Sequence, residues 1–352
     1  MLNIVFSYDY ELFLGKNFKS SKEILFDPTY RLISLLDKYG IKSTCFADVC
    51  SVFAHEKYGL DDFKNGFEEQ IRFLINNGHD VQLHIHPNWL LSEYVAGQWE
   101  IEKDHYKIHA FGFDKDKENN AYEIVLKGKN YLEDVLKKAN SSYKCVAYRA
   151  GGYSVQPHDE LFAYMRSLGI LVDSSVCRYA YDPAEKTGYD FRQIPNEINW
   201  WVTPNKDFSY LGSKDEGGLY EVPLLVDKNK WYRMWDRKYL RIIRNSPING
   251  TYISMNKKHS RLYTLAKKVI EYPRKSTPVA FDGMAYERMV DYLRDYEKKH
   301  RNENATISLI CHPKVLDDGV LDNMDKALSI LSKDENFNFI TIADVARSLE
   351  VK

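Results

Sequence analysis

Two histidines separated by one residue have a spacing that suits metal chemistry. His84 and His86 flank Ile85, and side chains of an extended strand alternate with a period of two, so both imidazoles point to the same side. Two imidazole nitrogens and a carboxylate make a half-open site for Zn²⁺ or a similar divalent ion. A lone buried histidine is more often a hydrogen-bonded core residue, but two in phase predict a pair of metal ligands.

Two carboxylates with the same spacing lie near the start of the chain. Asp9 and Glu11 flank Tyr10, and two neighbouring like charges resist ionisation unless a cation or a proton intervenes. One carboxylate can bind the metal while the other takes a proton from the attacking water. We therefore expect one metal ligand and one catalytic base, with the assignment between Asp9 and Glu11 open. A surface turn is the alternative explanation.

An arginine and a pair of glycines form a third group. Arg149 would be costly inside a barrel without a carboxylate partner, so we expect it to pair with Asp9 or Asp173 and to hold the base ionised. Both Arg149 and Asp173 are expected among the catalytic residues. The glycines that follow it let the backbone approach a ligand, so an N–H near Gly152 and Tyr153 could stabilise an oxyanion. A simple turn explains the glycines equally well.

A third histidine supplies the acid that such a reaction needs. His312 stands between Cys311 and Pro313, and an imidazole titrates near neutral pH, so it can protonate a departing amine. Alone it would be weak evidence, but it is the third histidine at the end of an expected strand and it fits the missing acid.

These polar residues all sit at the ends of short apolar runs that are typical of strands. Helical patterns separate the runs, and this alternation predicts βα units with a parallel sheet. The carboxyl ends of such strands share one face, where these folds build their active sites. The strands that carry the polar residues are expected at 3–7, 80–84, 144–148, 170–172 and 306–311.

The alternation of apolar runs and helical patterns stops between about residues 176 and 280. This stretch contains several prolines, a pair of adjacent glycines and many aromatic residues, which are typical of irregular structure. We interpret it as an insertion on the rim of the sheet, so that 1–352 forms a single domain.

Composition narrows the class of protein. The chain has 352 residues, of which 44% are hydrophobic and 28% charged, which excludes a disordered or collagen-like protein. Its five cysteines form no CxxC pair, which is typical of reduced thiols. The first residues lack the pattern of a secretion signal, and no apolar run approaches the roughly 20 residues that cross a bilayer. These features predict a cytoplasmic protein.

One segment is strongly basic although the whole chain is nearly neutral. Residues 228–275 carry 14 Lys and Arg against Asp236 and Glu271, a local charge of +12. Such a block indicates an anionic substrate, a membrane surface or a nucleic acid. Without a recognised binding motif, nucleic acid is the least expected partner.

Five short motifs occur in an order that resembles the NodB-like polysaccharide deacetylases, carbohydrate esterase family four. The motifs are Phe6–Glu11, Ser43–Phe46, Gly78–His84, Tyr148–Gly152 and Leu309–Pro313. The resemblance implies a distorted (β/α)7 barrel and the metal-dependent hydrolysis of an N-acetyl group on a sugar. It further implies that the arginine orients the base and that His312 is the general acid.

Three positions depart from the family's pattern. The family's second histidine lies four residues after the first, where this chain has Asn88, so either His86 serves instead or the third ligand is a different residue. The family's adjacent acids are separated here by Tyr10. The proline expected after Arg149 and Ala150 is Gly151.

The combined prediction is a metal-dependent N-deacetylase. Glu11, His84 and His86 would hold a divalent ion, most simply Zn²⁺, while Asp9 acts as base and His312 as acid. The missing export signal favours an intracellular precursor of a surface polysaccharide, linked to a diphosphate carrier. Contacts to that carrier, or to a membrane interface, are expected from Trp231, Trp235, Arg237 and Arg241.

Two other functions fit the same residues. One is a catalytically inactive barrel that binds a saccharide, in which Asn88 marks a lost metal site. The other is a metal-dependent amidohydrolase that acts on a non-sugar amide.

Overall fold

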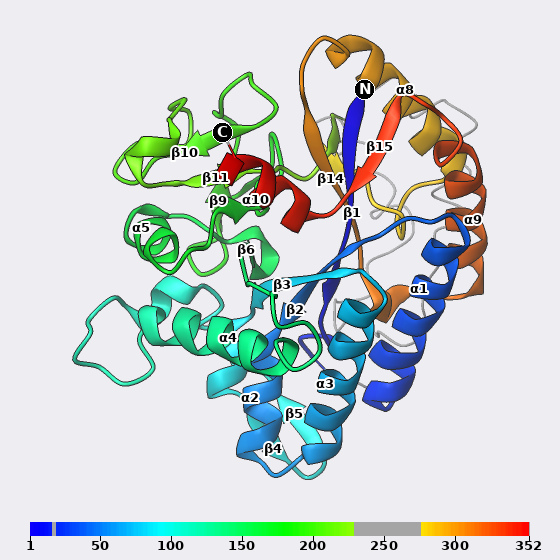
Figure 1. Ribbon diagram of the computed structural model, residues 1–352. Coiled ribbons are helices and arrows are strands. Elements are labelled where there is room, and N and C mark those ends of the chain that lie inside the picture. Colours follow the sequence, from blue (N-terminus) through cyan, green and yellow to red (C-terminus); the bar gives the residue numbers. More distant parts are fainter. Residues whose placement is uncertain (16–18, 229–275, 352) are drawn as a thin grey trace, which may run out of the picture.

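The fold is built around one curled, mainly parallel sheet (Figure 1). The computed structural model describes residues 1–15, 19–228 and 276–351. The strands follow the order β10-β11-β7-β6-β3-β2-β1-β14, and β15 pairs with the first half of β1. Only β10 runs antiparallel to its neighbour in this sheet. The strands are β1 (Leu2–Tyr10), β2 (Thr44–Asp48), β3 (Asp80–Ile85), β6 (Ala147–Ala150), β7 (Val172–Asp173), β10 (Trp200–Val202), β11 (Leu219–Glu221), β14 (Thr306–Cys311) and β15 (Phe337–Ile340).

Backbone hydrogen bonds join the two ends of the curled sheet. The amide of Leu225, just beyond β11, donates to the carbonyl of Ser308 on β14 at 2.9 Å, and Ser308 donates to Pro223 at 3.0 Å. The ring therefore runs through β1, β2, β3, β6, β7, the β11 segment and β14. This arrangement confirms the predicted distorted (β/α)7 barrel, with the distortion at the two-residue β7 and the short closing contact.

Helices surround the sheet (Figure 1). Amphipathic spacing explains most of them, as in α1, where Leu32, Ile33 and Leu36 are buried on one side. The sequence pattern did not predict α2, because seven of its nine residues are buried and the helix has no polar face. The helices are α1 (Asp27–Lys38), α2 (Val49–Lys57), α3 (Asp61–Asn76), α4 (Ala121–Leu136), α5 (Asp159–Ser167), α8 (Tyr286–His300), α9 (Asp318–Leu331) and α10 (Ile342–Val351).

The segment predicted as a rim insertion combines irregular chain with short strands. Its described part holds the hairpin of β8 (Tyr181–Asp182) and β9 (Tyr189–Asp190), followed by β10 and β11. The strand β12 (Val226–Lys228) pairs with β13 (Ser276–Pro278). A further hairpin, β4 (Glu93–Val95) with β5 (Gln98–Glu100), follows β3. Because β11 belongs to the barrel wall, the predicted insertion includes a strand of the fold itself.

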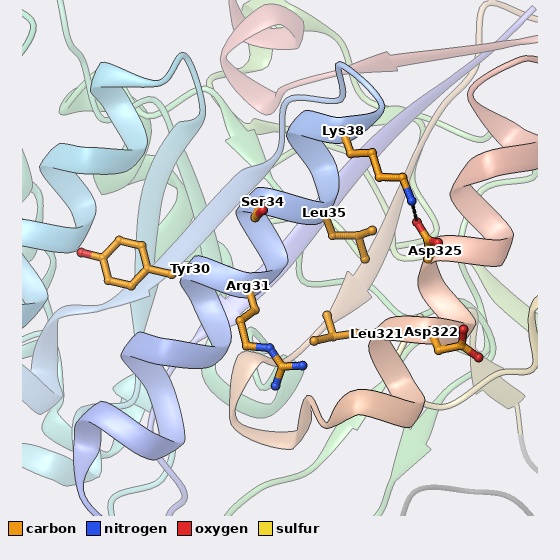
Figure 2. A pocket seen from close by; sticks show the side chains of 8 residues that line it. All are labelled: Tyr30, Arg31, Ser34, Leu35, Lys38, Leu321, Asp322 and Asp325. Carbon is orange, nitrogen blue, oxygen red and sulfur yellow. Dashed lines mark hydrogen bonds and ion pairs between the residues drawn. The ribbon is translucent and has the colours of Figure 1, made fainter.

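A shallow depression lies between the helices α1 and α9 (Figure 2). Its volume is about 580 Å³, and an ion pair of 2.6 Å between Lys38 and Asp325 crosses it. No residue predicted to do chemistry lines this depression. In the described parts of the chain, no helix combines the length and apolar character needed to span a membrane.

Candidate metal and catalytic centre

The predicted residues converge where the parallel strands end. Asp9 and Glu11 lie at the end of β1, the two histidines at the end of β3, and Arg149 on β6. Pairing register places Asp48 of β2 opposite His84, and His84 opposite Arg149. Residues more than 130 positions apart in the sequence, Asp9 and Arg149, thereby come into direct contact.

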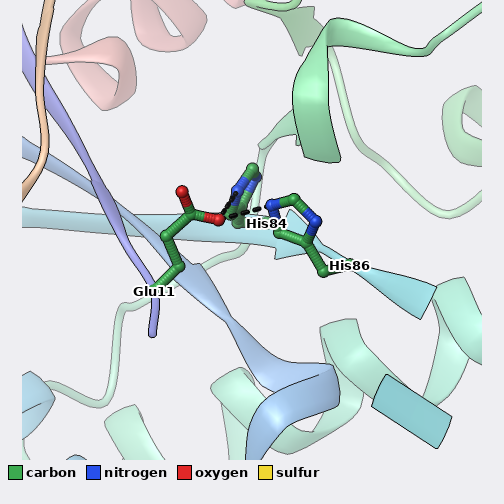
Figure 3. A group of neighbouring side chains, drawn as sticks. All are labelled: Glu11, His84 and His86. Carbon is green, nitrogen blue, oxygen red and sulfur yellow. Dashed lines mark ion pairs between the residues drawn. The ribbon is translucent and has the colours of Figure 1, made fainter. Parts of the chain in front are cut away.

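Glu11, His84 and His86 form a compact group of potential metal ligands (Figure 3). One ligand atom from each lies within 4.8 Å of the others. The carboxylate oxygen Oε2 of Glu11 is 3.4 Å from Nε2 of His84 and also contacts Nε2 of His86. The side chains are buried, and neither Glu11 Oε2 nor His84 Nε2 has a hydrogen-bond partner in the described residues. Two orphaned donor atoms facing each other fit a divalent cation.

The orientation of His84 is fixed by the neighbouring strand. Its Nδ1 lies 2.8 Å from the backbone carbonyl of Arg149, to which it donates. This contact leaves Nε2 facing Glu11, and in the neutral ring that nitrogen would offer its lone pair to a metal. Burial lowers the pKa of His84, but the charges of Asp9 and Glu11 outweigh it and raise the pKa to about 9. The site thus favours positive charge.

His86 occupies space that a glycine leaves free. A Cβ atom at Gly151 would lie 2.6 Å from Nδ1 of His86 and 2.7 Å from the carbonyl of Ile85. Asn88, at the family's usual second histidine position, is buried and donates instead to the carbonyl of Glu102 at 3.1 Å. Gly151 therefore leaves the space that the ring of His86 fills.

Lys314 is a site residue that the sequence pattern did not predict. Its Nζ is 2.7 Å from Oε1 of Glu11 and 3.3 Å from the carbonyl of Leu12. Burial raises the pKa of Glu11, but Lys314 and His86 outweigh it and hold that pKa well below its usual value. The only available signal was the position of Lys314 two residues after His312.

Arg149 binds the carboxylate of Asp9 deep in the barrel. Nη1 donates to Oδ1 of Asp9 at 2.7 Å, and the guanidinium lies 3.9 Å from the ring centre of Phe46. Its other nitrogens donate to oxygens of Ser7, Ser174 and Ser308. Burial raises the pKa of Asp9, yet Arg149, followed by nearby histidines, brings it below its ordinary value. Asp9 therefore stays ionised.

Asp173 lies in a different group. Its carboxylate accepts hydrogen bonds from the hydroxyl of Ser175 at 2.7 Å and from that residue's amide at 3.2 Å. It is paired in register with Glu221 of β11, and burial raises the pKa of both acids. Asp173 does not line the cavity beside the proposed metal ligands. Arg149, which was expected to pair with either Asp9 or Asp173, makes its ion pair with Asp9.

His312 is oriented by an aspartate outside the predicted motifs. Oδ2 of Asp282 accepts from both the backbone amide and Nδ1 of His312, each at 2.8 Å. The other ring nitrogen, Nε2, is 3.7 Å from Oδ2 of Asp9. Burial lowers the pKa of His312, but Asp282 outweighs burial and raises it above its ordinary value. Asp9, Glu11 and His312 also form a second group with potential metal-ligand atoms.

A cavity of about 260 Å³ opens onto these residues. Gly152 and Tyr153, which are expected to contact the substrate, border this cavity. Tyr106, which the sequence pattern did not predict, borders it as well. The predicted contacts Trp231, Trp235, Arg237 and Arg241 lie outside the described residues. The cavity is lined by Asp9, Glu11, Phe13, Leu14, His86, Tyr106, Gly152, Tyr153, His312 and Lys314.

Comparisons with known proteins support the fold. No family model and no curated protein matches the chain. The chain is similar to a provisionally assigned polysaccharide deacetylase from Mycobacterium smegmatis, with 14% identity, a TM-score of 0.50, and coverage of 99% of this chain and 90% of that one. It is also similar to the Puue allantoinase, with 13% identity, a TM-score of 0.50, and coverage of 100% and 91%.

A third similar structure has a different activity. The 4-alpha-glucanotransferase from Thermococcus litoralis matches with 12% identity and a TM-score of 0.52, over 99% of this chain and 40% of that one. At these identities the likeness shows the fold alone, because one fold hosts many activities.

Proposed function

We propose that this protein is a divalent-metal-dependent hydrolase that removes an N-acetyl group from a sugar. The observation that carries the proposal is the convergence of three elements in one cavity. These are the buried ligand group Glu11, His84 and His86, of which Glu11 and His86 line the cavity, the ionised base Asp9, and the aspartate-held His312.

The roles of the side chains follow from their contacts. A divalent ion held by Glu11, His84 and His86 would act as a Lewis acid toward the acyl carbonyl and lower the pKa of water. Asp9, whose Oδ1 is engaged by Arg149, takes the proton of the attacking water. His312, protonated and held by Asp282, gives a proton to the departing nitrogen.

Charge development on the acyl oxygen also needs a donor from the protein. The backbone near Gly152 borders the cavity and could present an N–H to that oxygen.

The products are acetate and a free amino sugar. The donor set of two imidazoles and one carboxylate favours Zn²⁺ among divalent ions.

The substrate is proposed to be an intracellular precursor of a surface polysaccharide, joined to a diphosphate carrier. The basic block at 228–275, with a local charge of +12, motivates this proposal. Cationic side chains such as Arg237 and Arg241 would contact the diphosphate, and Trp231 and Trp235 could stack on the sugar or rest at a membrane interface.

Metal analysis and acetate release test the proposal together. We expect the purified protein to bind one Zn²⁺ and to release acetate from an N-acetylated nucleotide sugar. His84→Ala should lose the metal and His312→Ala should keep it, and both should lower kcat by orders of magnitude. His300→Ala, at the end of α8, is the matched control and should remain active.

The alternatives give different results in the same assay. A protein that binds no metal and releases no acetate, even with added Zn²⁺, would be an inactive saccharide-binding barrel and would overturn the proposal. Turnover of small ureides without turnover of acetylated sugars would assign a non-sugar amide substrate. Charge reversal at Arg237 and Arg241 should weaken the binding of the diphosphate-linked substrate far more than the binding of the free sugar.

A further inference from the structure

Tyr106 reaches the cavity from outside the barrel strands. It lies between β5 and the short 3-10 turn Ile108–Phe111, and its side chain lines the cavity with His86, Gly152 and His312. Its ring packs edge-on against the ring of His86, with 5.9 Å between centroids and an interplanar angle of 75°. The segment after β3 therefore places a phenol directly beside a proposed metal ligand.

The backbone of Gly152 leaves space for the hydroxyl of Tyr106. Gly152 has a φ of +55°, and a Cβ atom built there would overlap Oη and the ring of Tyr106. The glycine thus permits both the left-handed backbone and the close approach of the phenol. The hydroxyl lies against the part of the backbone that we expect to face the acyl oxygen.

The hydroxyl of Tyr106 is available to a ligand. Within the described ranges, Oη of Tyr106 has no hydrogen-bond partner, whereas Tyr10 donates to Gln70 at 2.6 Å and Tyr143 to the carbonyl of Val81 at 2.8 Å. Tyr106 is half-buried, and a tyrosine in such a position usually finds a partner for this group. A phenol has an ordinary pKa of about 10 and keeps its proton near neutral pH. Tyr106 therefore presents a free donor to the cavity.

We propose that Tyr106 is a further catalytic residue, whose Oη–H donates a hydrogen bond to the acyl oxygen of the substrate. This role rests on the proposed function. When the water oxygen bonds to the acyl carbon, Asp9 takes the water's proton, the carbonyl π pair moves onto the acyl oxygen, and the hydrogen bond from Tyr106 strengthens. That pair then re-forms the C=O bond as the C–N bond breaks, the nitrogen takes its proton from His312, and Tyr106 keeps its own proton throughout.

The variant Tyr106→Phe tests this role, because it removes only the hydroxyl. Loss of one oxyanion donor lowers kcat by about 10²–10³, so we expect that loss with a nearly unchanged KM and an unchanged metal content. Tyr94→Phe is the matched control, since Tyr94 lies on β4 after the same strand but does not line the cavity. It should keep the wild-type kcat.

Binding of a transition-state analogue provides a readout besides turnover. A methylphosphonamidate analogue of the acetamido sugar carries a tetrahedral anionic centre, so Tyr106→Phe should weaken its binding by at least about tenfold. The deacetylated product has no acyl oxygen and should bind wild type and variant equally. A purely structural role of Tyr106 would weaken both ligands alike and would overturn the assignment.

Failure of this assignment is distinguishable from failure of the proposed function. An active wild type with an equally active Tyr106→Phe variant overturns the role of Tyr106 alone. If the wild type releases no acetate from any acetylated sugar, whatever its metal content, the proposed function is overturned and the role of Tyr106 with it.

Discussion

Asp282 sets the protonation state of His312 at the centre of the site. Its Oδ2 accepts two hydrogen bonds from His312, one from the backbone and one from the ring. On the other side of the ring, Oδ2 of Asp9 is 3.7 Å from Nε2. Two carboxylates therefore favour the protonated imidazole against the effect of burial. A protonated His312 is the form that can donate to a leaving amine.

The pH profile of Asp282→Asn tests this pairing. Because the pKa of His312 is raised in the folded protein, its acid form persists to higher pH, and activity is lost as pH rises through that pKa. Removing the charge of Asp282 lowers the pKa of His312, so the basic limb of the kcat profile should move to lower pH. Asp322→Asn on α9, outside the cavity, is the control. An unmoved basic limb in the variant would contradict the assignment of His312 as the acid.

At the scale of elements, one carboxylate joins β2, α2 and the ligand segment after β3. Oδ1 of Asp48 accepts from the amide of Cys50 at 3.2 Å, which caps the start of α2. The same oxygen accepts from the amide of His86, also at 3.2 Å. Asp48 is fully buried at the end of β2, in register with His84. The helix cap thus also holds the backbone of a proposed ligand.

Replacing Asp48 by Ala should weaken both stability and metal binding. Loss of the cap costs about 1 kcal/mol, and the buried amide of His86 left without a partner adds about 1 kcal/mol or more. Outer contacts of metal ligands affect affinity about 10–100-fold, so the Kd for Zn²⁺ should rise by at least about tenfold.

A second helix cap provides the control for Asp48. Asn120 caps α4 by accepting from the amide of Glu123 at 3.1 Å, away from the metal ligands. Asn120→Ala should lose comparable stability, measured by denaturant unfolding, while its Kd for Zn²⁺ stays unchanged. Equal metal affinity in both variants would show that Asp48 acts only as a cap.

The sequence was sufficient to predict the elements with a clear period and the residues at strand ends. The strand Thr306–Cys311 and the convergence of Asp9 with Arg149 follow from local patterns. The helix α2 was missed because it is buried on all sides and lacks an amphipathic period. Asp282 and Tyr106 were missed because each lies in irregular chain, where only tertiary contacts bring the side chain to the site.

At the scale of the whole molecule, the proposed metal site exists only when the barrel is formed. Glu11 follows β1 and His84 lies on β3, and β2 separates these two strands in the sheet. Their contact of 3.4 Å joins residues 73 positions apart in sequence. Metal binding should therefore be coupled to folding, because the unfolded chain offers no comparable site.

Thermal unfolding with and without metal tests this coupling. A ligand at 100 times its Kd stabilises the folded state by about 2.7 kcal/mol, which corresponds to a rise in Tm of roughly 3–6 °C for a chain of this size. Zn²⁺ should produce that rise and a chelator should reverse it, whereas His84→Ala should unfold at the same temperature under both conditions. The control His300→Ala should respond like wild type. A Tm of the wild type that is indifferent to metal would mean that Glu11, His84 and His86 hold no ion in the folded barrel.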